Sequence, residues 1–316
     1  MRQIVLDLGG ADNGAWELVQ GASMALQAEA DLSFLLVGQG EAVQQALQSG
    51  LLDANRVELL PAERQIAPGD APDSILHEAG DTSMALALDA LRTRQEAVGL
   101  LSAGNTGALL VGSIFRLGLV PPLRTPALAS AIPTVQGDRV ILLDCGANLA
   151  PGTREYEQFA LLGAAYAARL MPHRTEIRVG VLSVGRESTK GTQSVRQAYA
   201  ALEALEFPRG GRFIGCVEGC DLCSGVADVI VCDGYAGNLL LKAHEAAGLA
   251  AMEAVRMLPI PQTAQAKTLA RLAELYELNL RGGAAFLGTV KPVIKMHGCA
   301  QAQTVCACTA QLLRSL

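Results

Sequence analysis

Aromatic side chains are scarce in this chain: Phe, Tyr and Trp together make up only 4% of its 316 residues. Half of the residues are nevertheless hydrophobic, so the core has to be built from Ala, Leu, Val and Ile. Side chains of this kind suit helices packed on a parallel sheet. The chain is long enough to bury a large core, either as one α/β unit or as two smaller ones.

Positive charge is also in short supply, because the formal net charge is −6. A protein that binds nucleic-acid phosphates without regard to sequence needs a broad basic surface. The composition gives no support to such a surface, so we expect no nucleic-acid partner. Any basic patch has to be local.

Long apolar runs are missing as well. The opening MRQIVLDLGG holds too few apolar residues before Asp7 for the hydrophobic region of a secretory signal. The stretch 97–120 falls short of the roughly 18 unbroken apolar residues of a membrane span, since it is interrupted by Ser102, Asn105, Thr106, Ser113 and Arg116. Eight cysteines without a signal sequence are typical of reduced thiols, so we expect a cytoplasmic protein.

Short apolar runs that end at glycine-containing turns recur along the chain and are typical of buried strands. They are IVLDLGG (4–10), SFLLVGQG (33–40), VGLLSAGNTG (98–107), VILLDCGAN (140–148), RVGVLSVG (178–185) and ADVIVCDGYAGN (227–238). Stretches with helical spacing lie between them, at 16–30, 81–94, 156–170 and 191–205. This alternation predicts an α/β fold with a mostly parallel sheet and helices on both faces. Ligands bind such sheets beyond the carboxyl ends of the strands.

We find no internal repeat and no linker, and we expect one domain over residues 1–316. The Pro- and Gly-rich stretch 61–80 is interpreted as a long surface loop. A helical pattern follows the sequence PIPQTAQAK, so we expect a helical segment, 250–282, that can protrude from the domain. Its amphipathic stripe favours core or dimer packing over contact with a membrane surface, and consists of Leu269, Leu272, Leu275 and Tyr276.

The stretch 100–110, LLSAGNTGALL, predicts a strand that ends at Ser102 and turns through Gly104 into a helix beginning near Asn105 or Thr106. The first N–H groups of a helix have no partner within it, so they attract anions. Glycine lets the backbone approach a phosphate closely. The alternative is an ordinary helix cap without a ligand. The motif matches neither the dinucleotide fingerprint nor the P-loop.

Several segments of this chain, taken in order, closely resemble bacterial phosphate acyltransferase. They are SAGNTGALL, LLDCGAN, QFALLGAAYA, FIGCVEG, VCDGYAGNLLLK and VIKMHG. The resemblance implies an enzyme of phospholipid synthesis that makes acyl phosphate from an acyl-carrier-protein thioester and inorganic phosphate. It also implies a fold related to isocitrate and isopropylmalate dehydrogenases, a homodimer and no organic cofactor. The matches run in order from about residue 98 to 298.

Such a reaction requires a site that holds a phosphate dianion, stabilises an oxyanion and releases a thiolate. Lys295 and His297 lie two residues apart in VIKMHG and would share one face of a strand. We expect Lys295 to neutralise charge and His297 to stabilise the oxyanion or to protonate the thiolate, with Asn105 as the third catalytic candidate. A structural role for His297 remains the alternative. The expected phosphate and substrate ligands are Ser102, Gly104, Thr106, Gly107, Asn148, Lys190, Asp233 and Asn238.

Two carboxylates, Asp144 and Asp233, occupy equivalent strand ends, where they could bind Mg²⁺ or cap the next turn. We favour capping and expect no metal, and Asp233 could also orient Lys242 or another cation. Lys190 precedes a predicted helix and is either an anion ligand or a solvated lysine.

Cys216, Cys220 and Cys223 have the CxxxCxxC spacing of iron–sulfur enzymes, but Cys216 ends a strand-like run rather than lying in a loop. We therefore interpret them as reduced thiols.

This chain also differs from the family at several positions. Cys220 stands where the family has an arginine. Ala11 follows the opening glycine pair where the family has an aspartate. The paired basic residues that the family has before residue 85 are missing here. Their loss reduces the basic surface available to an acidic carrier protein.

Two other functions are compatible with the same sequence features. One is an NAD-dependent decarboxylating dehydrogenase, which the missing adenine-site and metal-carboxylate patterns disfavour. The other is a non-catalytic paralogue that binds phosphate or acyl phosphate but lost the basic residues.

Overall fold

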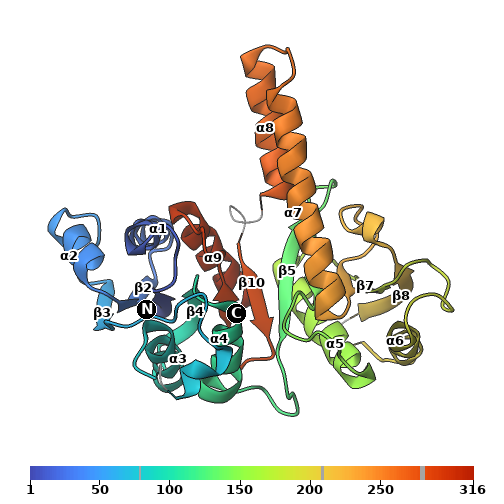
Figure 1. Cartoon of the computed structure of the whole chain (residues 1–316), viewed down its shortest axis with the longest axis horizontal. Helices are drawn as coiled ribbons and strands as arrows, with labels where there is room; N and C mark the ends of the chain where they lie inside the picture. The colour runs from blue at the N-terminus through green and yellow to red at the C-terminus, as the bar shows by residue number, and fades with distance from the viewer. Residues whose placement is uncertain (78–79, 208–209, 278–281) are drawn as a thin grey trace. The chain divides into compact units, whose positions relative to one another are not determined.

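The computed structural model describes residues 1–77, 80–207, 210–277 and 282–316. By residue contacts the chain divides into two compact units (Figure 1). Unit 1 comprises Met1–Pro126 and Asn279–Leu316, and unit 2 comprises Ala127–Leu278. That the two units fold together as the single expected domain stays a prediction.

Unit 1 is built on a sheet with the strand order β3-β2-β1-β4-β11-β10. Its strands are β1 (Arg2–Asp7), β2 (Leu32–Gly38), β3 (Val57–Pro61), β4 (Ala97–Ser102), β10 (Ala284–Leu287) and β11 (Val293–Lys295). Neighbouring strands pair in parallel, except that β10 and β11 are antiparallel. The central strands are apolar on both faces, as the continuous hydrophobic runs predict.

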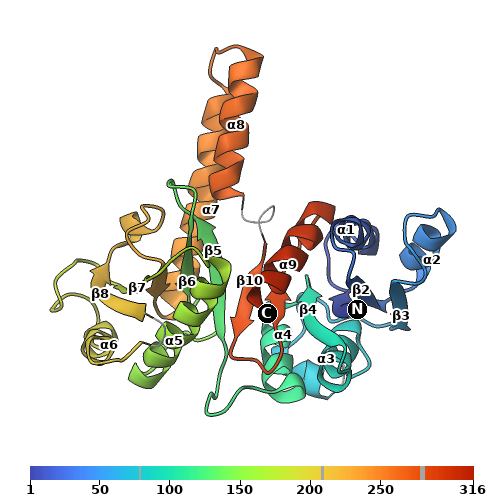
Figure 2. The same cartoon turned by 180° about the vertical axis from the view of Figure 1, so that it is seen from behind.

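The helices of unit 1 cover both faces of this sheet. They are α1 (Ala15–Ala28), α2 (Glu41–Gln48), the 3₁₀ turn η1 (Pro72–Leu76), α3 (Ser83–Thr93), α4 (Thr106–Gly112), its π-helical continuation η2 (Ser113–Leu117) and α9 (Ala302–Ser315). Helices α1 and α9 pack on each other, on the face opposite α3 and α4 (Figures 1 and 2). The expected helices 16–30 and 81–94 are thus confirmed within a few residues.

Unit 2 has a second sheet segment with the order β5-β6-β9-β7-β8. Its strands are β5 (Ala127–Pro133), β6 (Arg139–Leu143), β7 (Ile177–Leu182), β8 (Gly211–Val217) and β9 (Val229–Val231). All described pairs are parallel except β5 with β6. The remaining elements are α5 (Thr153–Leu170), α6 (Gln193–Glu203), the 3₁₀ turn η4 (Gly219–Asp221), α7 (Gly234–Arg256) and α8 (Gln262–Tyr276). Helices α5 and α7 lie on opposite faces (Figures 1 and 2).

Helices α7 and α8 form an antiparallel hairpin that extends away from the sheet of unit 2 (Figure 1). The side chain of Tyr276 stacks on His244, with 4.8 Å between ring centroids, and packs where Gly248 has no Cβ. The expected stripe on α8 is half-buried in this hairpin, whereas no residue of α8 is fully buried. Residues 278–281 of the expected helical segment lie outside the described residues. No helix in the described ranges is long and apolar enough to cross a membrane.

The prediction of an α/β fold with a mostly parallel sheet between helices is confirmed. The two antiparallel pairs, β5 with β6 and β10 with β11, were not predicted, because short apolar runs give no signal for strand direction.

Candidate active site

Three polar side chains lie side by side where three strands of unit 1 end. Strand pairing places Ser102 of β4 opposite Asp7 of β1 and opposite Lys295 of β11. The carboxyl ends of parallel strands are where ligands bind in sheets of this kind. The sequence predicted Ser102 and Lys295 for this position but missed Asp7, although Asp7 also ends an apolar run.

Asp7 and Ser102 are both buried and are joined by a hydrogen bond, in which Ser102 Oγ donates to Asp7 Oδ2 at 2.7 Å. The N–H of Gly9 donates to the other carboxylate oxygen of Asp7 at 3.0 Å, and Ser83 is a further side-chain partner. Burial raises the pKa of Asp7 above its ordinary value, although these hydrogen bonds oppose the rise. Ser102 Oγ in turn accepts from the N–H of Gly104 at 3.1 Å. A buried hydrogen-bonded chain therefore fixes the turn that leads into α4.

Two glycine turns pack directly against each other at this point. A Cβ on Gly10 would lie 2.7 Å from the Cα of Gly104, and a Cβ on Gly104 would lie 2.5 Å from the side chain of Met84. Gly10 also has a φ of 75°, which favours glycine. The close approach of these turns explains why both carry glycine.

The ammonium of Lys295 is held at the same turn. Its Nζ donates to the backbone carbonyl of Ala103 at 3.0 Å and to that of Met296. Burial lowers the pKa of Lys295 to about 8, while the carboxylates of Asp12 and Asp7 oppose that shift. The site thus holds a partly desolvated cation between two backbone carbonyls.

The residues at the start of α4 are placed as predicted, but Asn105 is used differently. Asn105 is the N-cap residue, and its Oδ1 accepts from the N–H of Ala108 at 3.0 Å. Its Nδ2 donates to the carbonyl of Pro68 at 3.2 Å, so both ends of the side chain are engaged. Thr106 is exposed, and Gly107 leaves room for the ring of Pro72. The N–H groups of the first helical residues have no acceptor within the helix.

His297 lies just beyond the strand that carries Lys295. Strand β11 ends at Lys295, so the alternation that predicted a shared face for the two side chains does not extend to His297. His297 is half-buried and begins a turn in which its carbonyl accepts from the N–H of Ala300. The opening loop packs on this turn, because the N–H of Asp12 donates to the carbonyl of Gly298 at 2.8 Å. The displaced aspartate that follows the opening glycines is therefore part of the site.

Unit 2 gathers a second group of predicted residues where β6 meets α7. The buried carboxylate of Asp144 accepts from the N–H groups of Leu128 at 2.6 Å and Asn148 at 2.5 Å, and burial raises its pKa. Asp233 caps α7 by accepting from the N–H of Ala236 at 2.7 Å. Both carboxylates therefore cap turns, as expected.

The start of α7 packs closely on this loop because it carries glycine. A Cβ on Gly234 would lie 2.6 Å from Asp144 Oδ2, and the N–H of Gly234 donates to the carbonyl of Asn148 at 2.7 Å. Asn238 lies next to the loop glycine Gly146. Asn148, Asp233 and Asn238 are thus brought together within unit 2.

Two expectations about lysines of unit 2 have different outcomes. Lys242 donates to Glu245 at 2.7 Å rather than to Asp233, and that Asp233 orients another cation stays a prediction. Lys190 is exposed in the loop between β7 and α6, where its N–H donates to the carbonyl of Glu187. Its role as an anion ligand stays a prediction.

The three cysteines of the CxxxCxxC motif have different surroundings. The thiol of Cys216 is buried and faces the carbonyl of Glu187 at 3.9 Å, and the thiol of Cys223 lies 3.7 Å from Nδ1 of His244. Cys220 is exposed. Among the described residues, one group has ligand atoms close enough together to hold a metal ion. It consists of Glu218, Cys220 and Asp221, so it includes only one cysteine of the motif. Arg186 already pairs with both carboxylates, at 3.3 and 2.8 Å.

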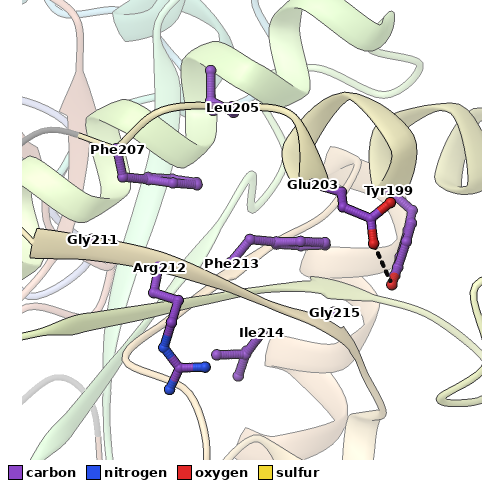
Figure 3. A pocket seen from close by; sticks show the side chains of 9 residues that line it. All are labelled: Tyr199, Glu203, Leu205, Phe207, Gly211, Arg212, Phe213, Ile214 and Gly215. Carbon is purple, nitrogen blue, oxygen red and sulfur yellow. Dashed lines mark hydrogen bonds between the residues drawn. The ribbon is translucent and has the colours of Figure 1, made fainter.

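A cavity of about 460 Å³ opens beside the edge strand β8 and is lined by none of the predicted site residues (Figure 3). Tyr199 and Phe213 meet edge to face there, with 5.3 Å between ring centroids. The phenol of Tyr199 donates to Glu203 at 3.4 Å, and Arg212 pairs with Glu176 nearby. The cavity therefore lies apart from the strand ends that carry the candidate site of unit 2.

Sequence comparison identifies relatives over nearly the whole chain. A family model described as fatty acid synthesis protein matches residues 2–313. A phosphate acyltransferase of Streptococcus sanguinis (strain SK36) is 34% identical over 320 residues, covering 99% of this chain and 94% of the relative. A phosphate acyltransferase of Gloeobacter violaceus is 36% identical over 313 residues, covering 96% of this chain and 90% of the relative.

Solved structures with the same fold are more distant in sequence. The EutD phosphotransacetylase from Staphylococcus aureus matches with a TM-score of 0.65 and 16% identity, over 99% of this chain and 94% of that chain. A branched-chain phosphotransacylase from Enterococcus faecalis V583 has the same TM-score and identity, over 99% and 98%. At this identity the likeness concerns the fold alone.

Proposed function

Because this chain belongs to the fatty acid synthesis protein family and is an enzyme of the phosphate acyltransferase type, we propose that it transfers a fatty acyl group from acyl-carrier protein to inorganic phosphate. The product would be acyl phosphate, and the reaction would serve phospholipid synthesis without an organic cofactor. The observation that carries the proposal is the ammonium of Lys295 beside the Ser102–Gly104 turn, at the head of α4. A cation beside the start of a helix is an arrangement that suits a phosphate dianion.

In this reaction a phosphate oxygen attacks the thioester carbonyl, and the carbonyl oxygen becomes an oxyanion before the thiolate leaves. Lys295 would neutralise phosphate charge, and His297 would stabilise the oxyanion or protonate the thiolate. Asn105 would act through the turn that it caps, since its side chain already holds Ala108 and Pro68. The phosphate would meet Ser102, Gly104, Thr106 and Gly107. From unit 2 we assign Asn148, Lys190, Asp233 and Asn238 to substrate binding.

Thiol release from a fatty acyl-carrier protein, measured with and without inorganic phosphate, tests the proposal. Trapping the acyl phosphate with hydroxylamine identifies the product. We expect phosphate-dependent release that Asn105→Ala and His297→Ala reduce, while the exposed residues Asn55 and His173 serve as matched alanine controls. A non-catalytic paralogue would release no thiol, and a dehydrogenase would require NAD. Unchanged rates in both site variants would remove the site assignment.

We also propose a cytoplasmic homodimer that makes peripheral contact with lipid through the tip of the α7–α8 hairpin. The tip exposes Met257, Leu258 and Ile260, and Met257 is 75% exposed. Co-sedimentation with phospholipid vesicles should decrease for Leu258→Asp, whereas Leu249→Asp on the exposed side of α7 is the control. Equal binding by both variants would contradict the tip assignment, and analytical ultracentrifugation reports the oligomeric state.

A further inference from the structure

Within the part of the chain that the structure describes, Lys295 is held so that one of its N–H groups remains for a ligand. A lysine ammonium has three N–H donors. Two of them are used by the carbonyls of Ala103 and Met296, which belong to the two chain segments that meet at the site. Met296 is itself tied to β4, because its N–H donates to the carbonyl of Ser102 at 2.8 Å. These contacts hold Nζ at the turn that leads into α4.

Among the described residues, the charged and titratable groups that act on Lys295 come from several segments around it. They are Asp7 at the end of β1, Asp12 in the loop that follows, Cys299 in the turn after β11 and Cys308 on α9. His297 lies two residues further along the chain. Asp7 is bound to Ser102 and Gly9, so it lies beside the lysine without being its hydrogen-bond partner. The ammonium is therefore near negative charge but can exchange its proton with a substrate.

We propose that Lys295 relays the proton of the reaction, giving one to the departing sulfur and then taking one from the attacking hydrogen phosphate. This rests on the proposed function and decides between the two roles left open for His297, which would then stabilise the oxyanion. Lys295 would be a catalytic residue rather than only a counter-charge.

The proton balance of the reaction requires such a carrier. When an oxygen of HPO₄²⁻ attacks, a C–O bond forms and the C–S bond breaks, with the electron pair leaving on sulfur. The P–OH proton has to be lost, because acyl phosphate is a dianion, and the departing thiolate has to gain one. If Lys295 gives its proton to sulfur and the neutral amine then takes the phosphate proton, the enzyme returns to its starting state.

The acidity of Lys295 suits this exchange. Burial lowers its pKa to about 8, close to the value of about 8.5 for an ordinary thiol. Proton transfer is most effective when donor and acceptor have similar pKa values near the working pH. A solvated lysine, with a pKa of about 10.4, would hold its proton too tightly.

A change of leaving group tests the proposal. Lys295→Arg keeps the positive charge but cannot release a proton in this pH range. With an alkyl thioester we expect its kcat to fall by about 10²-fold or more, the usual worth of general acid–base catalysis. An aromatic thiol leaves readily as a thiolate, so with its thioester the loss should be less than about 10-fold. The control Lys291→Arg alters a lysine of the same segment that donates to the carbonyl of Arg94 at 2.7 Å.

The outcomes separate this inference from the proposed function. His297→Gln should reduce kcat equally with both thioesters. Equal losses for Lys295→Arg with both thioesters, in a variant whose thermal melting matches the wild type, would overturn the proton-carrier role. Ethylamine should also restore activity to Lys295→Ala, and its failure to do so would count against the role. If the wild-type protein releases no thiol from either thioester, the proposed function fails instead.

Discussion

The buried ammonium of Lys295 makes a prediction about stability that does not depend on catalysis. Its pKa is about 8 in the folded protein, below the 10.5 of a solvated lysine. The folded state therefore binds this proton more weakly than the unfolded chain does. The charge opposes folding at every pH below about 8, and the opposition fades as the pH rises from 8 to 10.5.

The size of the effect follows from the two pKa values. Linkage gives a penalty of about 3 kcal/mol at pH 7, which falls to about 1 kcal/mol at pH 10. Lys295→Met removes the charge and also removes the donors to Ala103 and Met296, a cost that does not depend on pH. Comparing the variant with the wild type at both pH values cancels that cost. The free-energy difference between them should therefore change by about 2 kcal/mol.

Urea unfolding of both proteins at pH 7, 8, 9 and 10 measures this difference. The stability of the variant relative to the wild type should be about 2 kcal/mol higher at pH 7 than at pH 10. Lys291→Met shows what the loss of another lysine from the same segment does. A Lys295→Met difference that follows the Lys291→Met difference at every pH would refute the assignment of a desolvated ammonium.

Two further substitutions test how unit 2 is held together, both by urea unfolding. The buried carboxylate of Asp228 accepts hydrogen bonds from Nε, Nη2 and the backbone N–H of Arg178, so Asp228→Ala should lower the free energy of unfolding by about 3–5 kcal/mol. Glu176 belongs to an exposed ion pair, so Glu176→Gln should lower it by less than about 1 kcal/mol. Equal costs would contradict the difference in burial. A Cβ on Gly237 would lie 2.0 Å from the carbonyl oxygen of Asp144. Gly237→Ala should therefore lower the free energy of unfolding by about 1–3 kcal/mol, although alanine has the higher helix propensity. A stabilised variant would contradict this packing.

Some of the candidate site could be predicted because its signals are local. The sequence SAGNTG predicted a strand end, a turn and a helix start near Asn105, and α4 begins at Thr106 with Asn105 as its cap. The sequence also predicted that Asp144 and Asp233 would cap turns. These features depend on residues two to four positions apart, so the pattern alone contains them.

Other parts of the site depend on partners that are distant in the chain. Asp7 is bound to Ser102 across 95 positions, and Lys295 to Ala103 across 192. Nothing in either segment identifies its partner, because strand order is decided by how the whole sheet is packed. The second contact of Asn105, to Pro68 in the loop before η1, was missed for the same reason.

The sequence by itself determined the α/β alternation, the glycine turns at the strand ends and the choice of small aliphatic residues for the core. Those features follow from periodicity and backbone geometry, which act over a few residues. Only the tertiary structure decided which strand ends are neighbours. It also gave the cysteines of one motif different surroundings, and it buried Lys295 at the turn made by Ser102 and Gly104. Burial and strand pairing arise when distant segments meet, so they appear only once the chain has folded.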